Sequence, residues 1–322
     1  MNRRYDVCVL GSFMKDLVAS AERRPLPGET LHGTGFAEFL GGKGVNQAIA
    51  AARMGARTTI VGTIGDDRYG EEFLELLKSD GVDTEWVLRH PELGTGVGLP
   101  LVLPDGGNSI IIVSRANSAI TPADIEAAAE VLAASGVLSV QLELPVEASR
   151  AALELASAAG VTTILTPAPV GTVDPSLGEF VDILVPNEVE AAALTGLDCD
   201  DESEVPAIAR RLTAEWDLRG CVITLGARGA FVRDELTGEE LRVPAHRVAT
   251  VDTVGAGDAF CGSLAASLAA GAGLADAVRL ANAAGALSTT IHGAAVSAPD
   301  RSSALRLLDA QSVEEPVGRL RS

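Results

Sequence analysis

The hydrophobic and polar positions from about residue 122 onward alternate between two patterns. Segments with apolar residues at helical spacing are separated by short, continuous apolar runs. This alternation predicts a doubly wound α/β fold, in which helices cover both faces of a mostly parallel sheet. Helices are expected at residues 122–134, 146–158 and 275–287, the first with Thr121 as its cap and Pro122 at its first position. Strands are expected at residues 137–142, 161–165, 183–185 and 221–225.

The first third of the chain has a different pattern. Residues 7–10 are apolar and end at Gly11, which indicates a buried parallel strand. Residues 57–64 predict a second strand, and residues 48–54 and 70–79 predict helices. Residues 17–40 contain several prolines and glycines, and residues 95–102 and 108–113 flank a hairpin turn at 104–107. These short segments predict antiparallel strands outside the main sheet.

The two patterns together predict the domain organisation. We expect one α/β domain over residues 1–308, with a small β lid formed by strands from about residues 14–40 and 95–115. Residues 309–322 carry mixed charge and are expected to form a loosely held C-terminal tail. No internal repeat or low-complexity linker indicates a further domain.

A glycine-rich turn lies between short strands expected within residues 241–251 and a buried helix expected at 259–270. Gly255 and Gly257 let the backbone turn and bring amide groups close to a ligand. A helix start offers unpaired N–H groups and a partial positive charge, which together bind anions. Asp258 would project from the first helical turn, beside such an anion. Taken alone, Asp258 fits equally well an acid that stabilises a helix start, but the paired glycines favour a functional role.

A second glycine-rich turn, at residues 41–44, precedes the helix expected at 48–54. It is not a Walker A loop, because Gly44 stands where a serine or threonine would hold magnesium, and no dinucleotide-binding G-x-G-x-x-G follows a strand. Three glycines around Lys43 predict a turn that contacts a ligand, and Asn46 can both donate and accept hydrogen bonds to a polyol hydroxyl. Asp16 follows the first strand, at the edge where open α/β sheets bind ligands, although a solvent-exposed turn acid is the alternative.

Composition and charge exclude several classes of function. The chain has 322 residues, 47% of them hydrophobic, and a formal net charge of −19 without a basic block, so a nucleic acid or an anionic membrane is not expected as a partner. An anionic substrate would need a local positive site. The four cysteines form no C-x-x-C pair and the four histidines show no metal-ligand spacing. With no signal peptide or membrane span evident, the sequence predicts a cytosolic protein with buried thiols.

Considered together, the two glycine-rich turns resemble the two signatures of the ribokinase-like (PfkB) carbohydrate kinases. Stretches between them also match the family in order, and these are Pro27-Gly28-Glu29-Thr30, Gln141-Leu142-Glu143, Pro167-Ala168-Pro169, Pro186-Asn187-Glu188-x-Glu190 and Thr224-Leu225-Gly226-x-x-Gly229. The similarity runs from about residue 6 to residue 300, and within the family it is greatest to the ribokinases. The resemblance implies a ribokinase-like fold and ATP-dependent phosphorylation of a sugar, D-ribose at its 5-hydroxyl.

The resemblance also implies a role for each matching residue. Asp258 would act as the general base and the amides of Gly255, Ala256 and Gly257 as the anion hole, with the helix N-terminus keeping Asp258 ionised at neutral pH. The sugar-binding positions correspond to Asp16, Gly42, Lys43, Asn46 and Glu143. The nucleotide and Mg²⁺ region corresponds to Asn187, Glu190, Thr224, Gly226, Gly229 and Asn282. A monovalent-cation site, which would hold K⁺, corresponds to Asp252, the backbone of Val254, and Thr289, Gly293 and Ser297.

Three residues depart from the ribokinase pattern, and alternatives follow from them. Thr166 and Arg115 replace a common asparagine and a common glycine, and Met14 replaces an asparagine beside Asp16. A thioether donates no hydrogen bond to a sugar hydroxyl, so 2-deoxyribose becomes an alternative substrate. Another sugar or nucleoside kinase of the same fold, a catalytically silent sugar-binding module and a nicotinamide-dependent oxidoreductase are further alternatives, the last weakened by the missing dinucleotide fingerprint. Exposed lid strands would leave unpaired edges, so a homodimer with paired lids is expected.

Overall fold

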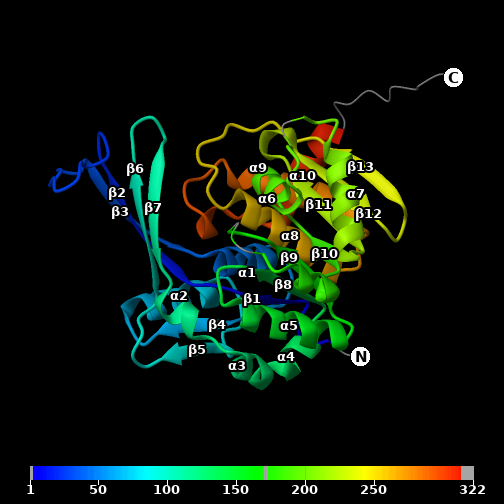
Figure 1. Cartoon of the computed structure of the whole chain (residues 1–322), viewed down its shortest axis with the longest axis horizontal. Helices are drawn as coiled ribbons and strands as arrows, with labels where there is room; N and C mark the ends of the chain where they lie inside the picture. The colour runs from blue at the N-terminus through cyan, green and yellow to red at the C-terminus, as the bar shows by residue number, and fades with distance from the viewer. Residues whose placement is uncertain (1–2, 170, 172, 200, 313–322) are drawn as a thin grey trace.

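The computed structural model describes residues 3–312 apart from residues 170, 172 and 200, and it contains two sheets (Figure 1). The larger sheet has nine strands in the order β13-β12-β11-β10-β9-β8-β1-β4-β5. Its strands are β1 (Val7–Leu10), β4 (Thr58–Gly65), β5 (Val87–His90), β8 (Val137–Gln141), β9 (Thr162–Thr166), β10 (Ile183–Leu184), β11 (Gly220–Thr224), β12 (Ala230–Asp234) and β13 (Glu239–Val243). All pairs from β5 to β11 are parallel, and β12 and β13 add an antiparallel edge. The predicted mostly parallel sheet is confirmed.

Helices cover both faces of this sheet and enclose two hydrophobic cores (Figure 1). The helices are α1 (Lys43–Arg53), α2 (Arg68–Ser79), α3 (Pro122–Ala127), α4 (Ala129–Ala133), α5 (Val146–Ala158), α6 (Glu188–Thr195), α7 (Val205–Trp216), α8 (Ala256–Ala269), α9 (Leu274–Ser288) and α10 (Arg301–Ser312). In β1, Val7 and Val9 belong to one core and Cys8 and Leu10 to the other, because successive side chains of a strand point to opposite faces. A strand buried on both faces must be apolar throughout, which is why it was recognisable in the sequence.

The second sheet projects from one end of the main body (Figure 1). Its four strands, in the order β3-β2-β6-β7, are β2 (Met14–Ser20), β3 (Gly35–Gly41), β6 (Gly96–Val102) and β7 (Asn108–Val113). The pair β2–β6 is parallel, while β2–β3 and β6–β7 are antiparallel. All of β7 is exposed, and Ile111 at its centre has 65% of its surface accessible. This sheet therefore presents an uncovered apolar strand to solvent.

A buried lysine joins the small sheet to the main body. The Lys15 ammonium on β2 lies 2.7 Å from a carboxylate oxygen of Glu72 on α2 and 3.1 Å from one of Glu38 on β3, and its side chain is 7% exposed. It also lies 5.4 Å from the centre of the Tyr69 ring. An ammonium at this depth needs compensating charge, and of its two carboxylate partners Glu72 on α2 ties β2 to the main body.

Several predicted boundaries are wrong. Helix α1 begins at Lys43 rather than at residue 48, so Gly44 lies inside the helix; a Cβ on Gly44 would be 2.2 Å from the Cα of Gly11, which means that the helix packs directly on the end of β1. The helix expected at 122–134 is interrupted at Ala128, whose φ of −90° and ψ of 5° separate α3 from α4. Asp16 lies in β2 and not in a turn.

Other boundaries differ near the C-terminus. The last strand of the large sheet ends at Val243, so residues 244–251 are not strands as predicted. Of the predicted tail, residues 309–312 continue α10 and the remainder lies outside the described residues. Thr121 caps α3 as predicted, in a capping box with Asp124. All four cysteines are buried and unbridged, and no helix in the described part of the chain is long and apolar enough to cross a membrane.

Candidate active site

The two glycine-rich turns lie next to each other, at the N-termini of two helices in contact. Helices α1 and α8 pack so closely that a Cβ on Gly262 would be 2.3 Å from the carbonyl oxygen of Gln47. The contact brings Asp258, in the first turn of α8, to the amide side chains of α1. Asn46 Nδ2 donates a 2.8 Å hydrogen bond to Asp258 Oδ2, and Gln47 Nε2 donates a 3.1 Å bond to Oδ1. Residues more than 200 positions apart thus form one buried site.

The turn before α8 has the geometry that a close approach of backbone requires. Gly255 caps the helix with φ of 79°, in the left-handed region, and a Cβ there would be 2.7 Å from the Cα of Ala294. Only glycine satisfies both conditions without strain. The amides of Gly255, Ala256 and Gly257 are at the helix start, where a helix leaves its first N–H groups without intrahelical partners. The Ala256 amide makes a 3.3 Å bond to the Thr253 carbonyl.

Burial changes the proton affinity of Asp258. Loss of water raises the pKa of its carboxyl above the ordinary value of 3.8, while Lys43 and the amides of Asn46 and Gln47 oppose the rise and Glu143 adds to it. The prediction that a helix start would keep this group ionised did not include burial, which acts in the opposite direction. A raised pKa makes the carboxylate a stronger proton acceptor, which suits a general base.

Lys43 places a positive charge among the carboxylates of the site. Burial acts most strongly on this ammonium and lowers its pKa, but Asp258, Glu143 and Glu190 together outweigh that effect, and the pKa of Lys43 lies above its ordinary value. The side chain is therefore charged at neutral pH. In a chain with a net charge of −19, Lys43 supplies the local positive potential that an anionic ligand requires.

Asp16 and Glu143 face each other on the sugar side of the predicted site. Glu143 Oε2 accepts hydrogen bonds from the Lys43 amide at 3.0 Å and from the Ser12 hydroxyl. The Asp16 carboxylate fits between two glycines, since a Cβ on Gly41 would be 2.9 Å from Oδ2 and one on Gly98 would be 2.2 Å from Oδ1. Burial, and after it the charge of Glu143, raises the pKa of Asp16 to about 6.

The raised pKa of Asp16 predicts a specific pH dependence of stability. The folded protein binds this proton more tightly than the unfolded chain, whose aspartates titrate near 3.8, so the contribution of Asp16 to stability falls as pH rises from about 4 through about 6. We expect the free energy of unfolding of the wild type, minus that of Asp16→Asn, to decrease over this range and to stay constant above about pH 7. Urea unfolding at a series of pH values measures this difference, with Asp276→Asn on the surface of α9 as control. A difference that does not change with pH would contradict the assignment.

The predicted nucleotide residues gather at the ends of β10 and β11. Asn187 and Glu190 form a capping box at the start of α6. The backbone amide of Asn187 donates to Glu190 Oε2 at 2.8 Å, and the backbone amide of Glu190 donates to Asn187 Oδ1 at 2.8 Å. Thr224 pairs with Asn187 in an isolated parallel bridge. Burial raises the pKa of Glu190, with the Asn187 amide and Lys43 acting against it. Both side chains therefore serve the local structure, whatever else they bind.

Three further residues of this group shape the adjoining loops. Gly226 and Gly229 have φ of 53° and 94°, and a Cβ on Gly229 would be 2.0 Å from the Val243 carbonyl oxygen. Asn282, buried on α9, donates a 2.6 Å hydrogen bond to the Pro244 carbonyl. These contacts hold the end of β13 against the end of β11.

The predicted monovalent-cation residues lie in two loops that Asp252 connects. Its Oδ1 accepts the Val254 amide and its Oδ2 accepts the Gly293 amide, each at 3.0 Å. The Thr289 carbonyl accepts the Asp252 amide at 3.0 Å. Ser297 belongs to the second loop, but its hydroxyl bonds within that loop to the Ala294 carbonyl at 2.8 Å. Four of the five predicted residues are thus in one hydrogen-bonded unit.

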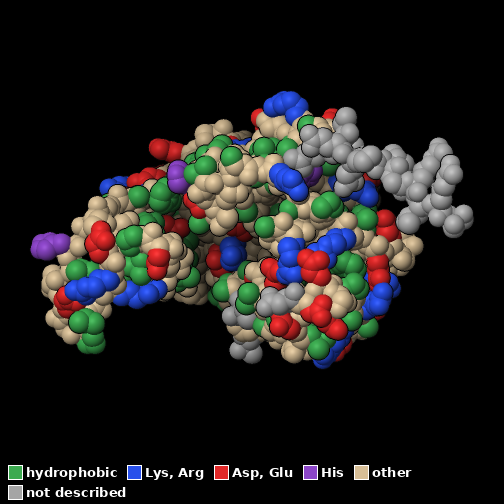
Figure 2. Space-filling view, turned by 90° about the horizontal axis from the view of Figure 1, so that it is seen from above, with side chains coloured by type: hydrophobic (Ala, Val, Ile, Leu, Met, Phe, Trp, Pro, Cys, Tyr) green, Lys and Arg blue, Asp and Glu red, His purple; other side chains and the backbone are tan. Residues whose placement is uncertain are grey.

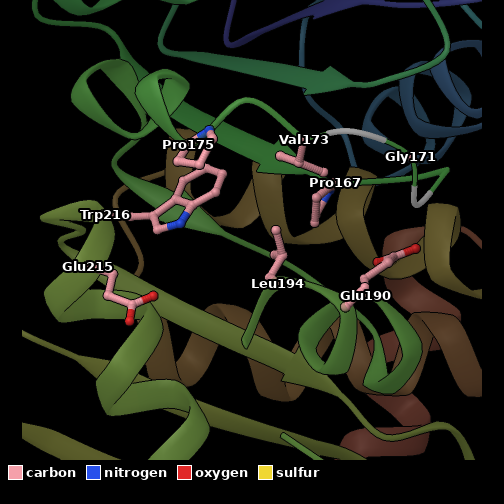
Figure 3. A pocket seen from close by; sticks show the side chains of 9 residues that line it. Pro167, Gly171, Val173, Pro175, Glu190, Leu194, Glu215 and Trp216 are labelled. Carbon is pink, nitrogen blue, oxygen red and sulfur yellow. The ribbon is translucent and has the colours of Figure 1, made fainter. Parts of the chain in front are cut away.

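Two hollows are visible on the molecule (Figures 2 and 3). Viewed from above, the molecule has a recess between the lobe that carries the small sheet and the larger body, with acidic and basic side chains inside it (Figure 2). A separate pocket of about 350 Å³ lies between α6, α7 and the segment after β9, with Glu190 at one end and Trp216 and Leu194 in its wall (Figure 3). Of the predicted site residues only Glu190 borders this pocket, so the chemistry is not assigned to it.

The sequence did not reveal several residues that organise the site. Gln47 has no predicted role, although it is a polar residue at the start of an otherwise apolar helix, which is the signal that could have identified it. Asn117 is completely buried and its side chain binds both the amide of Phe13, at 2.9 Å, and its carbonyl, at 2.8 Å. The Thr166 hydroxyl lies 3.4 Å from the sulfur of Cys261, one helical turn after Asp258. Within the described residues, no group of three or more His, Cys, Asp or Glu could hold a metal ion.

Comparison with known proteins identifies relatives over nearly the whole chain. A mouse ribokinase is 39% identical over 267 residues, which cover 82% of this chain and 81% of that protein, and a deoxyribokinase of Salmonella typhi is 38% identical over 81% of this chain and 84% of its own. The structure of Arabidopsis thaliana ribokinase complexed with ribose and ATP has a TM-score of 0.87 and 29% identity, covering 96% of this chain and 99% of that one. The sequence pattern of the pfkB family carbohydrate kinases matches residues 4–301. The chain therefore belongs to the pfkB family of carbohydrate kinases.

Proposed function

We propose that the protein transfers the γ-phosphoryl group of ATP to the 5-hydroxyl of D-ribose. The observation that carries this proposal is the position of Asp258: a buried carboxylate at the start of α8, bonded to Asn46 of the opposite turn and preceded by the glycine turn 255–257. A base beside an array of amides at a helix N-terminus is sufficient for phosphoryl transfer, which depends mainly on positioning and charge stabilisation.

In the proposed reaction each residue has a defined task. Asp258 accepts the proton of the 5-hydroxyl as the sugar oxygen forms its bond to the γ-phosphorus, and the bond from that phosphorus to the β-phosphate oxygen breaks to release ADP. The amides of Gly255, Ala256 and Gly257 stabilise the negative charge on the transferred group, and Lys43 contributes positive potential. Asp16, Gly42, Asn46 and Glu143 hold the other hydroxyls of the sugar, and Thr224, Gly226, Gly229 and Asn282 form the nucleotide side.

We infer that Mg²⁺ and K⁺ assist at the residues predicted for them. Mg²⁺ is usually bound through one or two carboxylates, waters and substrate phosphates, and the buried carboxylate of Glu190 beside Asn187 fits that arrangement. A monovalent cation prefers oxygen ligands, and the carboxylate of Asp252, the hydroxyl of Ser297 and the backbone carbonyls of Val254, Thr289 and Gly293 are of that type. Asp252 already orders both loops through hydrogen bonds, so a cation there would stabilise the same conformation.

The proposal is tested by initial rates of ADP formation with D-ribose and with 2-deoxy-D-ribose, in the presence of Mg·ATP and with or without K⁺. Preference for ribose and a higher rate with K⁺ are the expected results. Hexoses and nucleosides complete the panel, because turnover with one of these and not with ribose would assign another kinase activity. No ADP formation with any sugar would reject the enzymatic proposal and leave the silent sugar-binding module.

2-Deoxyribose is the second candidate substrate because of Met14. This residue begins β2, opposite Gly41 and Gly96, and is 6% exposed beside the strand position of Asp16. Its thioether offers no donor for a 2-hydroxyl and fits a deoxy position better. Met14→Asn is expected to favour ribose over deoxyribose relative to the wild type, and the ratio of the two kcat/KM values measures the change.

We further propose that the protein is a cytosolic homodimer whose small sheets cover each other. The exposed apolar strand β7 and the free edges of the sheet are the surface that a second copy would bury. Light scattering is expected to give the mass of two chains for the wild type and of one chain for Ile111→Glu. Leu236→Glu, a change at an exposed leucine (69%) on the β12–β13 hairpin, serves as control and should remain dimeric. A wild-type mass of one chain would reject the dimer.

A further inference from the structure

Gln47 is a completely buried side chain in the candidate active site to which no role has been assigned. It lies on α1, next to Asn46, and its Nε2 donates a 3.1 Å hydrogen bond to Asp258 Oδ1. Its side-chain carbonyl points away from Asp258, toward β8 at the centre of the sheet. The contacts on that side determine what Gln47 can do.

Two donors on β8 hold the other end of the Gln47 amide. Ser139 Oγ donates to Gln47 Oε1 at 2.9 Å and Gln141 Nε2 donates to the same oxygen at 2.6 Å. Both donors are buried in the central sheet. An ionised carboxylate only accepts hydrogen bonds, so Gln47 presents its Nε2 to Asp258 and its Oε1 to Ser139 and Gln141. The hydrogen bonds therefore run in one direction: Ser139 and Gln141 donate to Gln47, and Gln47 donates to Asp258.

Asn46 and Gln47 differ in what they have left to offer a ligand. Asn46 Nδ2 binds Asp258 Oδ2, while its Oδ1 is buried with no hydrogen-bond partner among the described residues. A buried acceptor without a partner is unfavourable unless a ligand or water fills it. Gln47, by contrast, uses both ends of its amide within the protein. Asp258 Oδ2 can therefore exchange its hydrogen bond from Asn46 for one from the substrate, whereas Oδ1 keeps its bond from Gln47.

We propose that Gln47, held by Ser139 and Gln141, is a positioning residue that keeps Asp258 Oδ1 occupied and so directs the substrate proton to Oδ2. This inference rests on the proposed kinase function. Gln47 touches the base and not the substrate, so its removal should reduce kcat and leave the sugar KM nearly unchanged. A residue that served only the stability of the fold would leave kcat per folded molecule unchanged, so the rate is referred to the folded fraction of each variant.

The pH profile provides a second readout. A donor to the carboxylate favours its charged form, so loss of Gln47 should raise the pKa of Asp258 and move the acid limb of kcat/KM to higher pH. The charged and titratable groups that also face Asp258 are Lys43 on α1, Glu143 after β8, Glu190 on α6 and Cys261 on α8. None of them is changed by the substitution.

The test is a double-mutant cycle on the full-length enzyme, measured as ADP formation with the preferred pentose. Gln47→Leu is expected to lower kcat about 10- to 100-fold, the equivalent of one hydrogen bond to a charged group. Ser139→Ala should lower kcat by a smaller factor, and it should have no further effect when Gln47 is already leucine, because Ser139 acts through Gln47. Ser149→Ala, an equally buried serine on α5, is the matched control and should retain the wild-type rate.

The outcomes separate the inference from the proposed function. No ADP formation by the wild type with any sugar overturns both. An active wild type with kcat and acid limb unchanged in a folded Gln47→Leu variant overturns the inference alone, as does an additive cycle. If Gln47→Leu does not fold, Ser139→Ala and Gln141→Leu must each lower kcat and move the acid limb to higher pH, and the absence of both effects also overturns the inference. Titration of carboxyl ¹³C signals in the free protein reads the pKa of Asp258 without any turnover.

Discussion

Replacing Asp258 with asparagine is expected to lower kcat about 10²- to 10⁴-fold, the range that general-base catalysis contributes. The substituted amide has almost the same shape, but it cannot act as the proton acceptor. Asn46 and Gln47 donate to different oxygens of Asp258, so the NH₂ group of the new asparagine would face one of these two donors. The proposed sugar contacts from Asp16, Glu143 and residues 42–46 remain. Sugar binding measured by calorimetry should therefore persist while ADP formation is lost.

The control for this variant is Asp276→Asn. Asp276 lies on the exposed face of α9 and pairs with Arg279 at 2.7 Å, so its loss should leave the rate unchanged. If Asp258→Asn kept more than a tenth of the wild-type kcat, another group would have to accept the proton and the assignment of the base would be wrong.

Gly44→Ala is expected to have the largest effect on stability. The added Cβ would lie 2.2 Å from the Cα of Gly11 and 2.6 Å from the amide nitrogen of Ser12, and all of these neighbours are backbone atoms that cannot rotate away. Alanine would gain up to about 1 kcal/mol in helix propensity, but separating α1 from β1 should exceed that gain and leave a net loss of about 1–3 kcal/mol. Urea unfolding measures the loss.

The matched control is Gly273→Ala, before α9, where a Cβ meets nothing within 4 Å and φ is −65°. Its change should remain below about 1 kcal/mol, the usual range for a cap residue. A Gly44→Ala protein as stable as the wild type would show that α1 can move away from β1 without loss. Because Asn46 and Gln47 are on α1, the same variant should also lose kinase activity.

The parts of the fold that were predictable are those whose pattern is local. The strands of the parallel sheet are buried on both faces, so they read as continuous apolar runs, and helix α5 has the predicted bounds of Val146 and Ala158. Lid strands were predicted from about residue 14, but the bounds of β2 were not, because Lys15 and Asp16 are polar and their burial depends on Glu72 and on the glycines of neighbouring strands. The start of α1 was misplaced because Gly44 is a poor helix former, and its contact with Gly11 is visible only in three dimensions.

The candidate site was also predictable only where its pattern is local. The glycine-rich turns and Asp258 are recognisable because each is a short contiguous pattern, and the turns lie at helix starts as predicted. The partners of Gln47 could not be identified, since Ser139 and Gln141 are 92 and 94 positions away and both read as strand residues. The direction of the pKa shift of Asp258 also could not be predicted, because it depends mainly on how deeply α8 is buried.

The contact between α1 and α8 at Gly262 has a consequence for how the enzyme can change during evolution. The backbone carbonyl of Gln47 lies where any side chain larger than hydrogen would be at 262, so the distance between the two helices is set by a glycine. The glycine-rich turn at residues 41–44 and Asp258 are therefore held together by the packing of α1 on α8, and the strands of the small sheet form a separate sheet. Insertions or exchanges in the small sheet, which carries Met14 and Asp16, would leave the contact between α1 and Asp258 unchanged. Sequence change is therefore easier to accommodate in the small sheet than at the junction of the two helices.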